Sequence, residues 1–258
     1  MDDYAFPGSA APVGSSAYYV IRFAEPAQQP ALVALFGWRR ELIRIATGIS
    51  DAGLARIKLQ WWREELERAA AGAAQHPLAR RLGEAMRARR LPLTALDAMA
   101  QATDEDLRGE APWSRADLLA HCARGGGSFG ELLALVGQAS PEAGRELGTA
   151  ARLAEILRDL GGELRRERCR LPRADLQTAG LTPELDGLRN PASAEPLRRL
   201  LGELADLARL DHRRAGAASR WYALRRALLD EVARSGFDVI DAKTSITPLR
   251  KLWVAWRA

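Results

Sequence analysis

Apolar residues recur at helical spacing along almost the whole of this chain, and this periodicity is the feature that most limits its fold. One pattern begins near Ala31 and breaks between Gly48 and Gly53, and the next has a wide apolar face that includes Trp61 and Trp62. No strands alternate with helices, so the sequence predicts an all-α fold of one domain. The other helices are expected at residues 77–90, 94–109, 115–138, 193–213, 217–235 and 247–257, with one more beginning at Pro141.

Several of these helices begin at residues that favour helix starts. Ser50 or Asp51 is a predicted cap, as is Thr94, and Ser114-Arg-Ala-Asp117 has the spacing of a capping box. Ser140-Pro141-Glu142 combines a cap with a proline and an acid in the first turn. Only residues 15–23 have any strand character. Residues 1–14 predict a flexible N-terminal tail, followed by a single domain over residues 15–258.

The composition bears on the choice of partners. Hydrophobic residues make up 47% and charged residues 28% of the 258 residues, as in ordinary soluble proteins, and the net charge is +5. Almost all basic residues are arginines, which fits either a GC-rich genome or selection for binding phosphate groups. The charge permits anionic partners such as diphosphates or acidic lipid. Without a recognised nucleic-acid-binding motif, no nucleic-acid partner is expected.

The sequence predicts a cytoplasmic protein. Its N-terminus, Met-Asp-Asp-Tyr, lacks the basic and then apolar layout of a signal peptide, and no apolar run approaches the ~18 residues of a spanning helix. Cys122 and Cys169 are too few and too far apart for a metal cage or a disulfide framework, so reduced thiols are expected. The protein is therefore expected to be soluble, or at most peripheral to the inner face of a membrane.

The C-terminal residues 249–257 are the source of the membrane alternative. They mix Arg and Lys with Trp253 and Trp256, as helices that lie at a membrane interface do. The simpler interpretation is a terminal helix that docks on the bundle, and the sequence favours it.

The stretch from Glu155 to Pro172 carries the clearest chemistry. Asp159 and Glu163 are four residues apart, so on a helix their carboxylates project from one face. Such a pair can hold Mg2+, which often uses one or two protein carboxylates together with substrate phosphates. The alternative is a surface turn whose carboxylates pair with neighbouring arginines. Those arginines would suit a phosphorylated ligand: Arg158, Arg165, Arg166, Arg168 and Arg170.

Other motifs are excluded. Residues 126–130, Gly-Gly-Ser-Phe-Gly, match the nucleophile-elbow pattern, but they follow a helical pattern where that motif requires a strand. His76, His121 and His212 have no metal-ligand spacing to one another, and no Walker or dinucleotide-binding glycine pattern is present.

Several blocks of sequence, standing in the right order, resemble the squalene/phytoene synthase family. They are residues 37–42 and 50–66 for its early helices, 156–172 for its second acidic motif, and 237–239 with 245–252 for its C-terminal signature. The resemblance implies an isoprenoid synthase-type helical bundle around a central cavity, in which two prenyl diphosphates are joined head to head. Breaking the carbon–oxygen bond requires that the departing diphosphate be neutralised, which the family achieves with Mg2+ and basic side chains.

The chain departs from this family at the first acidic motif. Where the family has a cluster of aspartates, residues 43–47 are Ile, Arg, Ile, Ala and Thr. The second motif keeps Asp159 and has Glu163 in place of aspartate, while Glu155 replaces the usual asparagine and Arg170 a tyrosine. The missing carboxylates weaken any Mg2+ site, and no other cofactor is expected.

The resemblance therefore leaves two functions open. The favoured one is a non-catalytic family member that binds a prenyl diphosphate or isoprenoid lipid, or that acts on a protein partner as an assembly factor. One mitochondrial assembly factor of respiratory complex I resembles the same family. The alternative is an active prenyltransferase that condenses two prenyl diphosphates into a squalene- or phytoene-type product.

The candidate roles are as follows. Asp159 and Glu163 are the predicted catalytic and metal-binding residues. The predicted substrate-binding residues are Arg40, Arg44 and Arg158 for the diphosphate, with Ser15, Ser16 and Tyr19 closing over it. The alternative for the arginines is ion pairing with Glu41, Glu65 or Glu155. The glycines at 125–127 and 130 are expected to allow close approach or a kink in a helix that lines the cavity, and Phe129, Trp61 and Trp62 are expected to be packing residues.

Overall fold

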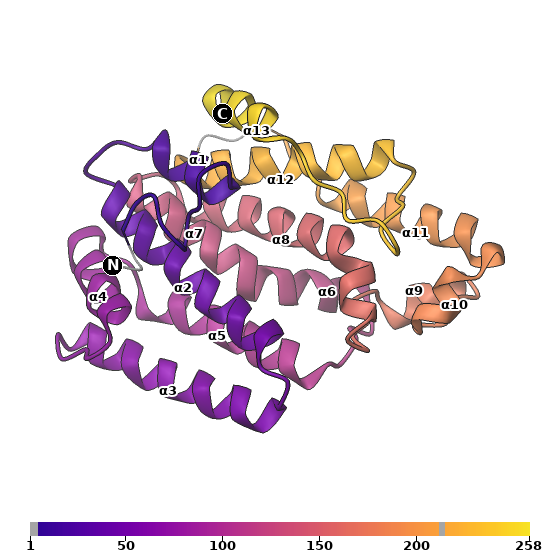
Figure 1. The fold of residues 1–258 in the computed structure, drawn as a ribbon, viewed down its shortest axis with the longest axis horizontal. Helices are drawn as coiled ribbons and strands as arrows, with labels where there is room; N and C mark the ends of the chain where they lie inside the picture. The colour runs from indigo at the N-terminus through magenta and orange to yellow at the C-terminus, as the bar shows by residue number, and fades with distance from the viewer. Residues whose placement is uncertain (1–4, 212–214) are drawn as a thin grey trace.

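The computed structural model describes residues 5–211 and 215–258, which fold into a bundle of helices (Figure 1). The α-helices are α1 (Ser16–Arg22), α2 (Gln29–Gly48), α3 (Ala52–Ala70), α4 (Pro77–Arg89), α5 (Leu93–Arg108), α6 (Arg115–Cys122), α7 (Ser128–Val136), α8 (Pro141–Leu164), α9 (Arg173–Thr178), α10 (Leu185–Arg189), α11 (Ala194–Leu207), α12 (Ala217–Arg234) and α13 (Pro248–Arg257). The all-α prediction is confirmed. His212 and the last two residues of the helix predicted at 193–213 lie outside the described residues, as do the first four of the predicted tail.

Three of the four predicted helix caps are confirmed. The Asp51 carboxylate accepts a hydrogen bond from the Leu54 amide at 2.6 Å and begins α3. Ser114 and Asp117 form the predicted capping box of α6, and Ser140 caps α8. The prediction of Thr94 as a cap is wrong, because α5 begins at Leu93 and its N-cap residue is Pro92.

The strand character of residues 15–23 was misleading. Residues 16–22 form α1, and the Ser15 hydroxyl caps it by accepting a hydrogen bond from the Tyr18 amide at 3.0 Å. Of the aromatic and β-branched side chains that suggested a strand, Tyr19, Val20 and Ile21 are instead buried where α1 packs against α2, α12 and α13. A local cap and tertiary burial together outweigh β-propensity here.

The helix predicted at 115–138 has a break that the glycines explain. A π-helical turn, η1 (Ala123–Gly127), joins α6 to α7. A Cβ atom at Gly130 would lie 2.1 Å from the Gly144 carbonyl oxygen, and one at Gly126 would lie 2.6 Å from the Gly148 carbonyl oxygen. These glycines therefore let η1 and α7 lie directly against α8, as the sequence predicted. Ser128 begins α7 and is buried, so its glycine-flanked pattern is no nucleophile elbow.

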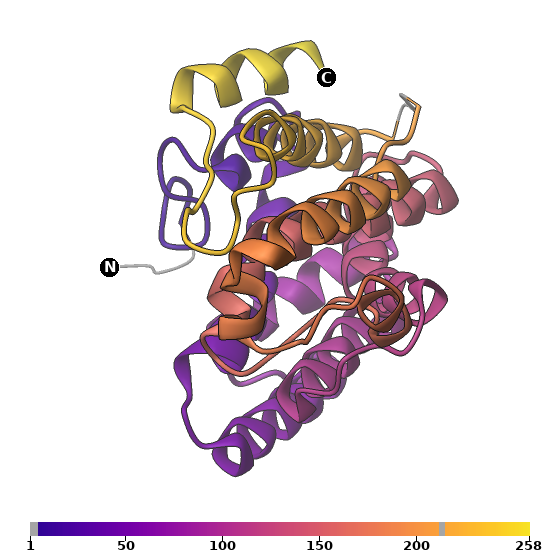
Figure 2. The ribbon, with the colours of Figure 1, turned by 90° about the vertical axis from the view of Figure 1, so that its right-hand side faces the viewer.

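Helix α8 runs through the middle of the bundle, packed between α7 and α12 (Figures 1 and 2). Phe129 and Trp62 are buried in the core as predicted, whereas Trp61 contacts Trp62 edge-on and stays partly exposed. In the N-terminal segment, Phe6 stacks on Tyr18 and Ala11 is buried. None of the described helices combines the length and hydropathy that a membrane span requires.

Candidate functional site

A cavity of about 470 Å³ opens between α2, α5, η1, α8 and α12, and the loops after α8 and α12 also line it. Nine basic side chains line this cavity against five carboxylates, so its surface is electropositive. Its apolar lining includes Leu42, Met99, Ala102, Phe129, Ile156 and Trp221. The predicted bundle around a central cavity is thus present.

One wall of the cavity is the inner face of α8. Arg152, Glu155, Asp159 and Glu163 succeed one another at three- and four-residue spacing and all line the cavity. The structure therefore brings Asp159 and Glu163 to the same side, as their spacing predicted. Each carboxylate is near an arginine: Asp159, whose side chain is 34% exposed, accepts two hydrogen bonds from Arg158, and Glu163 lies 3.6 Å from Arg166.

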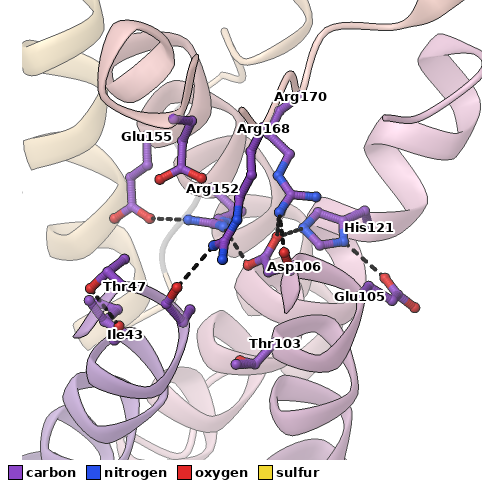
Figure 3. A network of polar contacts seen from close by, with 12 residues as sticks. Ile43, Thr47, Thr103, Glu105, Asp106, His121, Arg152, Glu155, Arg168 and Arg170 are labelled. Carbon is purple, nitrogen blue, oxygen red and sulfur yellow. Dashed lines mark hydrogen bonds and ion pairs between the residues drawn. The ribbon is translucent and has the colours of Figure 1, made fainter. Parts of the chain in front are cut away.

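The facing wall is the C-terminal half of α2. Ile43, Ala46 and Thr47 line the cavity there, and none of them can ligate a metal through a carboxylate. Arg44 turns away to pair with Glu41 at 2.8 Å, which is the ion-pairing alternative considered for it. Arg168, from the loop after α8, donates a hydrogen bond to the Ala46 carbonyl at 2.9 Å and so spans the two walls (Figure 3).

These side chains do not match the donor set of a resident Mg2+ cluster. Mg2+ needs several oxygen ligands held in near-octahedral order. Across residues 5–211 and 215–258, no three side chains among His, Cys, Asp and Glu are grouped as a metal site would require. Asp159 is also already paired with Arg158. We therefore derive no chemical step through a metal.

Glu155 is the centre of a buried ion cluster. Both of its carboxylate oxygens accept hydrogen bonds from Arg39 at 2.7 Å, Arg225 donates to one of them at 2.8 Å, and Arg152 lies 3.6 Å away. Burial alone would raise the pKa of Glu155, but the charges of Arg39, Arg225 and Arg152 outweigh it and lower the pKa to about 2. Glu155 is thus ionised and structural. Arg225 also stacks on Trp221, with its guanidinium 3.7 Å from the ring centroid.

A second buried carboxylate, Asp106, lies at the far side of the cavity (Figure 3). It pairs with Arg170 at 2.9 Å, and with Arg152 and the ring of His121 at 3.2 Å each. Burial opposes its ionisation, yet the hydrogen bond from His121 and the charges of both arginines hold the pKa of Asp106 well below its usual range. Arg170, which stands where the family has a tyrosine, is therefore part of this network.

A smaller hollow of about 320 Å³ adjoins the cavity and shares Arg39, Arg158 and Arg225 with it. Arg40 and Lys251 also line it, and no carboxylate does. Arg40 forms no ion pair with any residue in 5–211 or 215–258. Burial lowers the pKa of Lys251, and the nearby charges of Arg225 and Arg158 lower it further. We call this hollow the basic pocket.

Four of the six predicted substrate-binding residues line the basic pocket, and two do not. Ser15, Ser16, Arg40 and Arg158 all line the basic pocket. Tyr19 is buried in the core and Arg44 pairs with Glu41, and neither lines either hollow. Sequence reasoning missed the partners of Glu155, although Arg152 lies one turn before it on the same helix face and Arg39 precedes the predicted Arg40.

Comparison with known proteins agrees with the family resemblance of the sequence. The chain matches the squalene/phytoene synthase family over residues 10–251. A phytoene synthase of Mycobacterium bovis is 28% identical over 266 aligned positions, covering 92% of this chain and 84% of the relative. A phytoene synthase of Thermus thermophilus is 31% identical over 147 residues, which are 52% of this chain and only 50% of that relative.

Solved structures show the same fold. A squalene synthase of Alicyclobacillus acidocaldarius superimposes with a TM-score of 0.69 at 22% identity, over 85% of this chain and 88% of that one. A dehydrosqualene synthase solved with a ligand gives a TM-score of 0.70 at 19% identity, over 94% of this chain and 89% of that one. Because the family match spans nearly the whole sequence, the chain belongs to the squalene/phytoene synthase family.

Proposed function

We propose that the protein binds an isoprenoid diphosphate without ionising it. The observation that carries this proposal is the basic pocket, where five basic side chains converge with no carboxylate among them. A diphosphate is the kind of anion that several guanidinium groups can hold by charge-assisted hydrogen bonds. Arg40 has no competing ion pair within the described residues, so it is the best placed of them to bind the anion.

The adjoining cavity suits the hydrocarbon part of such a ligand. Its wall includes Met99, Phe129, Ile156 and Trp221, and apolar and aromatic walls bind hydrocarbon chains by burying their surface. Because Trp221 lines both hollows, a ligand with its diphosphate in the basic pocket can pass its chain directly into the cavity. Synthases of this family act on prenyl diphosphates, which have this two-part chemistry.

Turnover is a different matter from binding. Ionisation of an allylic diphosphate develops negative charge that a metal cluster normally stabilises. Here Asp159 is paired with Arg158 and the facing wall offers Ile43, Ala46 and Thr47, so we infer that the ligand is bound and kept intact. A protein that holds an isoprenoid without consuming it would suit a lipid-binding or assembly-factor role with a protein partner. We infer a cytoplasmic location for this role.

The test separates binding from catalysis. We expect farnesyl or geranylgeranyl diphosphate to bind in equilibrium titrations with EDTA present, with no squalene- or phytoene-type product after incubation with Mg2+. Arg40→Gln should weaken binding about tenfold, as expected for one charge-assisted hydrogen bond. Arg199→Gln, at an exposed arginine outside both hollows, is the matched control and should bind normally.

Two results would overturn the proposal in different ways. Product formation that Asp159→Ala abolishes would establish the active prenyltransferase instead. If neither diphosphate binds, with EDTA or with Mg2+, the proposal that the protein binds an isoprenoid diphosphate is wrong.

A further inference from the structure

The C-terminal helix α13 turns most of its apolar side chains to solvent. Leu249 is 78% exposed and Trp256 is 70% exposed, and Leu252 and Trp253 are exposed as well. At about 100° per residue, these four side chains occupy one continuous face of the helix. Ala255, beside this face, is buried, and α13 packs on α12 and α1. Docking on the bundle, which the sequence favoured, therefore accounts for only one face of α13.

The same segment has no negative charge. Residues 242–258 contain Lys243, Arg250, Lys251 and Arg257 and no Asp or Glu; Arg250 pairs with Glu231 of α12, which leaves Arg257 as the cation beside the exposed face. The guanidinium of Arg257 lies 4.7 Å from the ring centroid of Trp253, at the edge of the exposed apolar face. An apolar face that contains tryptophans and is bordered by an arginine is complementary to the headgroup region of an anionic bilayer.

We infer that the exposed face of α13, formed by Leu249, Leu252, Trp253 and Trp256, docks on the surface of an anionic lipid membrane. The apolar side chains enter the headgroup level, and Arg257 contacts the acidic headgroups. In Figure 2, α13 lies along the edge of the molecule with nothing covering its outer side.

This placement has a consequence for the basic pocket. Ile246 and Lys251 line that pocket, and Lys251 also donates a hydrogen bond to the Gly14 carbonyl at 3.1 Å beside it. Membrane docking through α13 would therefore bring the basic pocket close to the headgroup layer. The docking inference does not depend on the proposed diphosphate ligand, because it rests on α13 alone.

A second exposed apolar stripe provides a matched control. Leu54 and Ile57 on α3 are 56% and 69% exposed, similar to the residues of α13. Helix α3 lies at the opposite end of the molecule (Figure 1), and it carries Glu64 and Glu67 as well as basic residues. Substitutions on α3 thus remove comparable apolar surface without altering the cation-bordered face.

The experiment is flotation of the full chain with vesicles of phosphatidylglycerol and phosphatidylcholine, compared with phosphatidylcholine alone. We expect binding to the anionic vesicles that weakens with salt. The double substitution Leu249→Gln/Trp256→Gln should reduce vesicle affinity at least tenfold. Leu54→Gln/Ile57→Gln should have no effect, and Arg257→Gln should reduce the affinity about fivefold. Unchanged melting temperatures would confirm that all variants fold.

Three outcomes would overturn the inference. They are no flotation of the wild-type chain, equal losses for the α13 and α3 variants, and a wild-type dimer that the α13 variant dissociates without any vesicle binding. The last would assign the face to a second copy of the chain. Normal farnesyl diphosphate binding by the α13 variant would show that any lost flotation is independent of the proposed ligand site.

Discussion

The two walls that face each other across the cavity differ in kind. On α8, the carboxylates of Asp159 and Glu163 line the cavity. On α2, the facing side chains are Ile43, Ala46 and Thr47. The carboxylates of α8 therefore face no carboxylate from this part of α2 across the cavity. Asp159 pairs with Arg158, and Arg168 connects the walls through the Ala46 carbonyl. What a carboxylate on α8 can bind therefore depends on the side chains that face it from α2.

The largest expected effect concerns the one α8 carboxylate that is fully enclosed. Glu155→Ala should destabilise the protein by about 3–5 kcal/mol, because it leaves Arg39, Arg152 and Arg225 buried without their counter-charge. Urea unfolding followed by circular dichroism measures this. Glu163→Ala on the same wall is the control and should change the free energy of unfolding by less than about 1 kcal/mol, since its side chain is only partly buried. Equal losses of unfolding free energy in the two variants would contradict the distinction between a buried and a partly exposed carboxylate.

The dependence of stability on pH should also show the contribution of the buried Glu155 carboxylate. The pKa of Glu155 is lowered from 4.5 to about 2 in the folded protein, so its contribution is fully present above the unfolded value and is lost as the pH falls toward 2. That contribution is about 3 kcal/mol. In Glu155→Gln, the decline in stability between pH 4.5 and 2 should be shallower by this amount. A decline as steep as that of the wild-type protein would assign the acid sensitivity to other carboxylates.

Adding carboxylates to the α2 wall should make it resemble the α8 wall. We expect Ile43→Asp/Thr47→Asp to create a Mg2+ site with Asp159 and Glu163. At a Mg2+ concentration about five times its dissociation constant, the ion should stabilise this variant by about 1 kcal/mol. Thermal unfolding with and without Mg2+ measures the shift, and Ile43→Asn/Thr47→Asn is the uncharged control. An equal Mg2+ shift in the wild-type chain would mean that its present side chains already hold the ion.

The smallest expected effect tests the connection between the walls. Arg168→Gln should lower the free energy of unfolding by roughly 0.5–1 kcal/mol, because it removes one partly buried hydrogen bond to the Ala46 carbonyl. Faster amide hydrogen exchange at the C-terminal end of α2 should accompany it. Arg166→Gln is the matched control, since Arg166, in the turn after α8, donates its hydrogen bond back to the Gly162 carbonyl at the end of α8 and does not reach α2. If both variants speed exchange in α2 equally, Arg168 is not the specific link.

Much of the fold could be predicted because its determinants are local. Helical periodicity placed the long helices, and the Asp51, Ser114 and Ser140 caps fixed where three of them begin. Local reasoning failed at residues 16–22, where packing of α1 against its neighbours overrides the strand character of the sequence. The glycines at 125–127 and 130 did predict a close approach or a kink there, but the partner helix, α8, is known only from the structure.

For the candidate site, the sequence by itself determined which residues of one helix share a face. The four-residue spacing of Asp159 and Glu163 puts both carboxylates on one face of α8, and in the structure that face lines the cavity. Only the tertiary structure decided what those carboxylates and their neighbours meet. Glu155 binds Arg39 and Arg225, which lie 116 and 70 residues away in the chain. A charge is stabilised by whatever lies within a few ångströms of it, and for partners so distant in sequence that is set by how the helices pack.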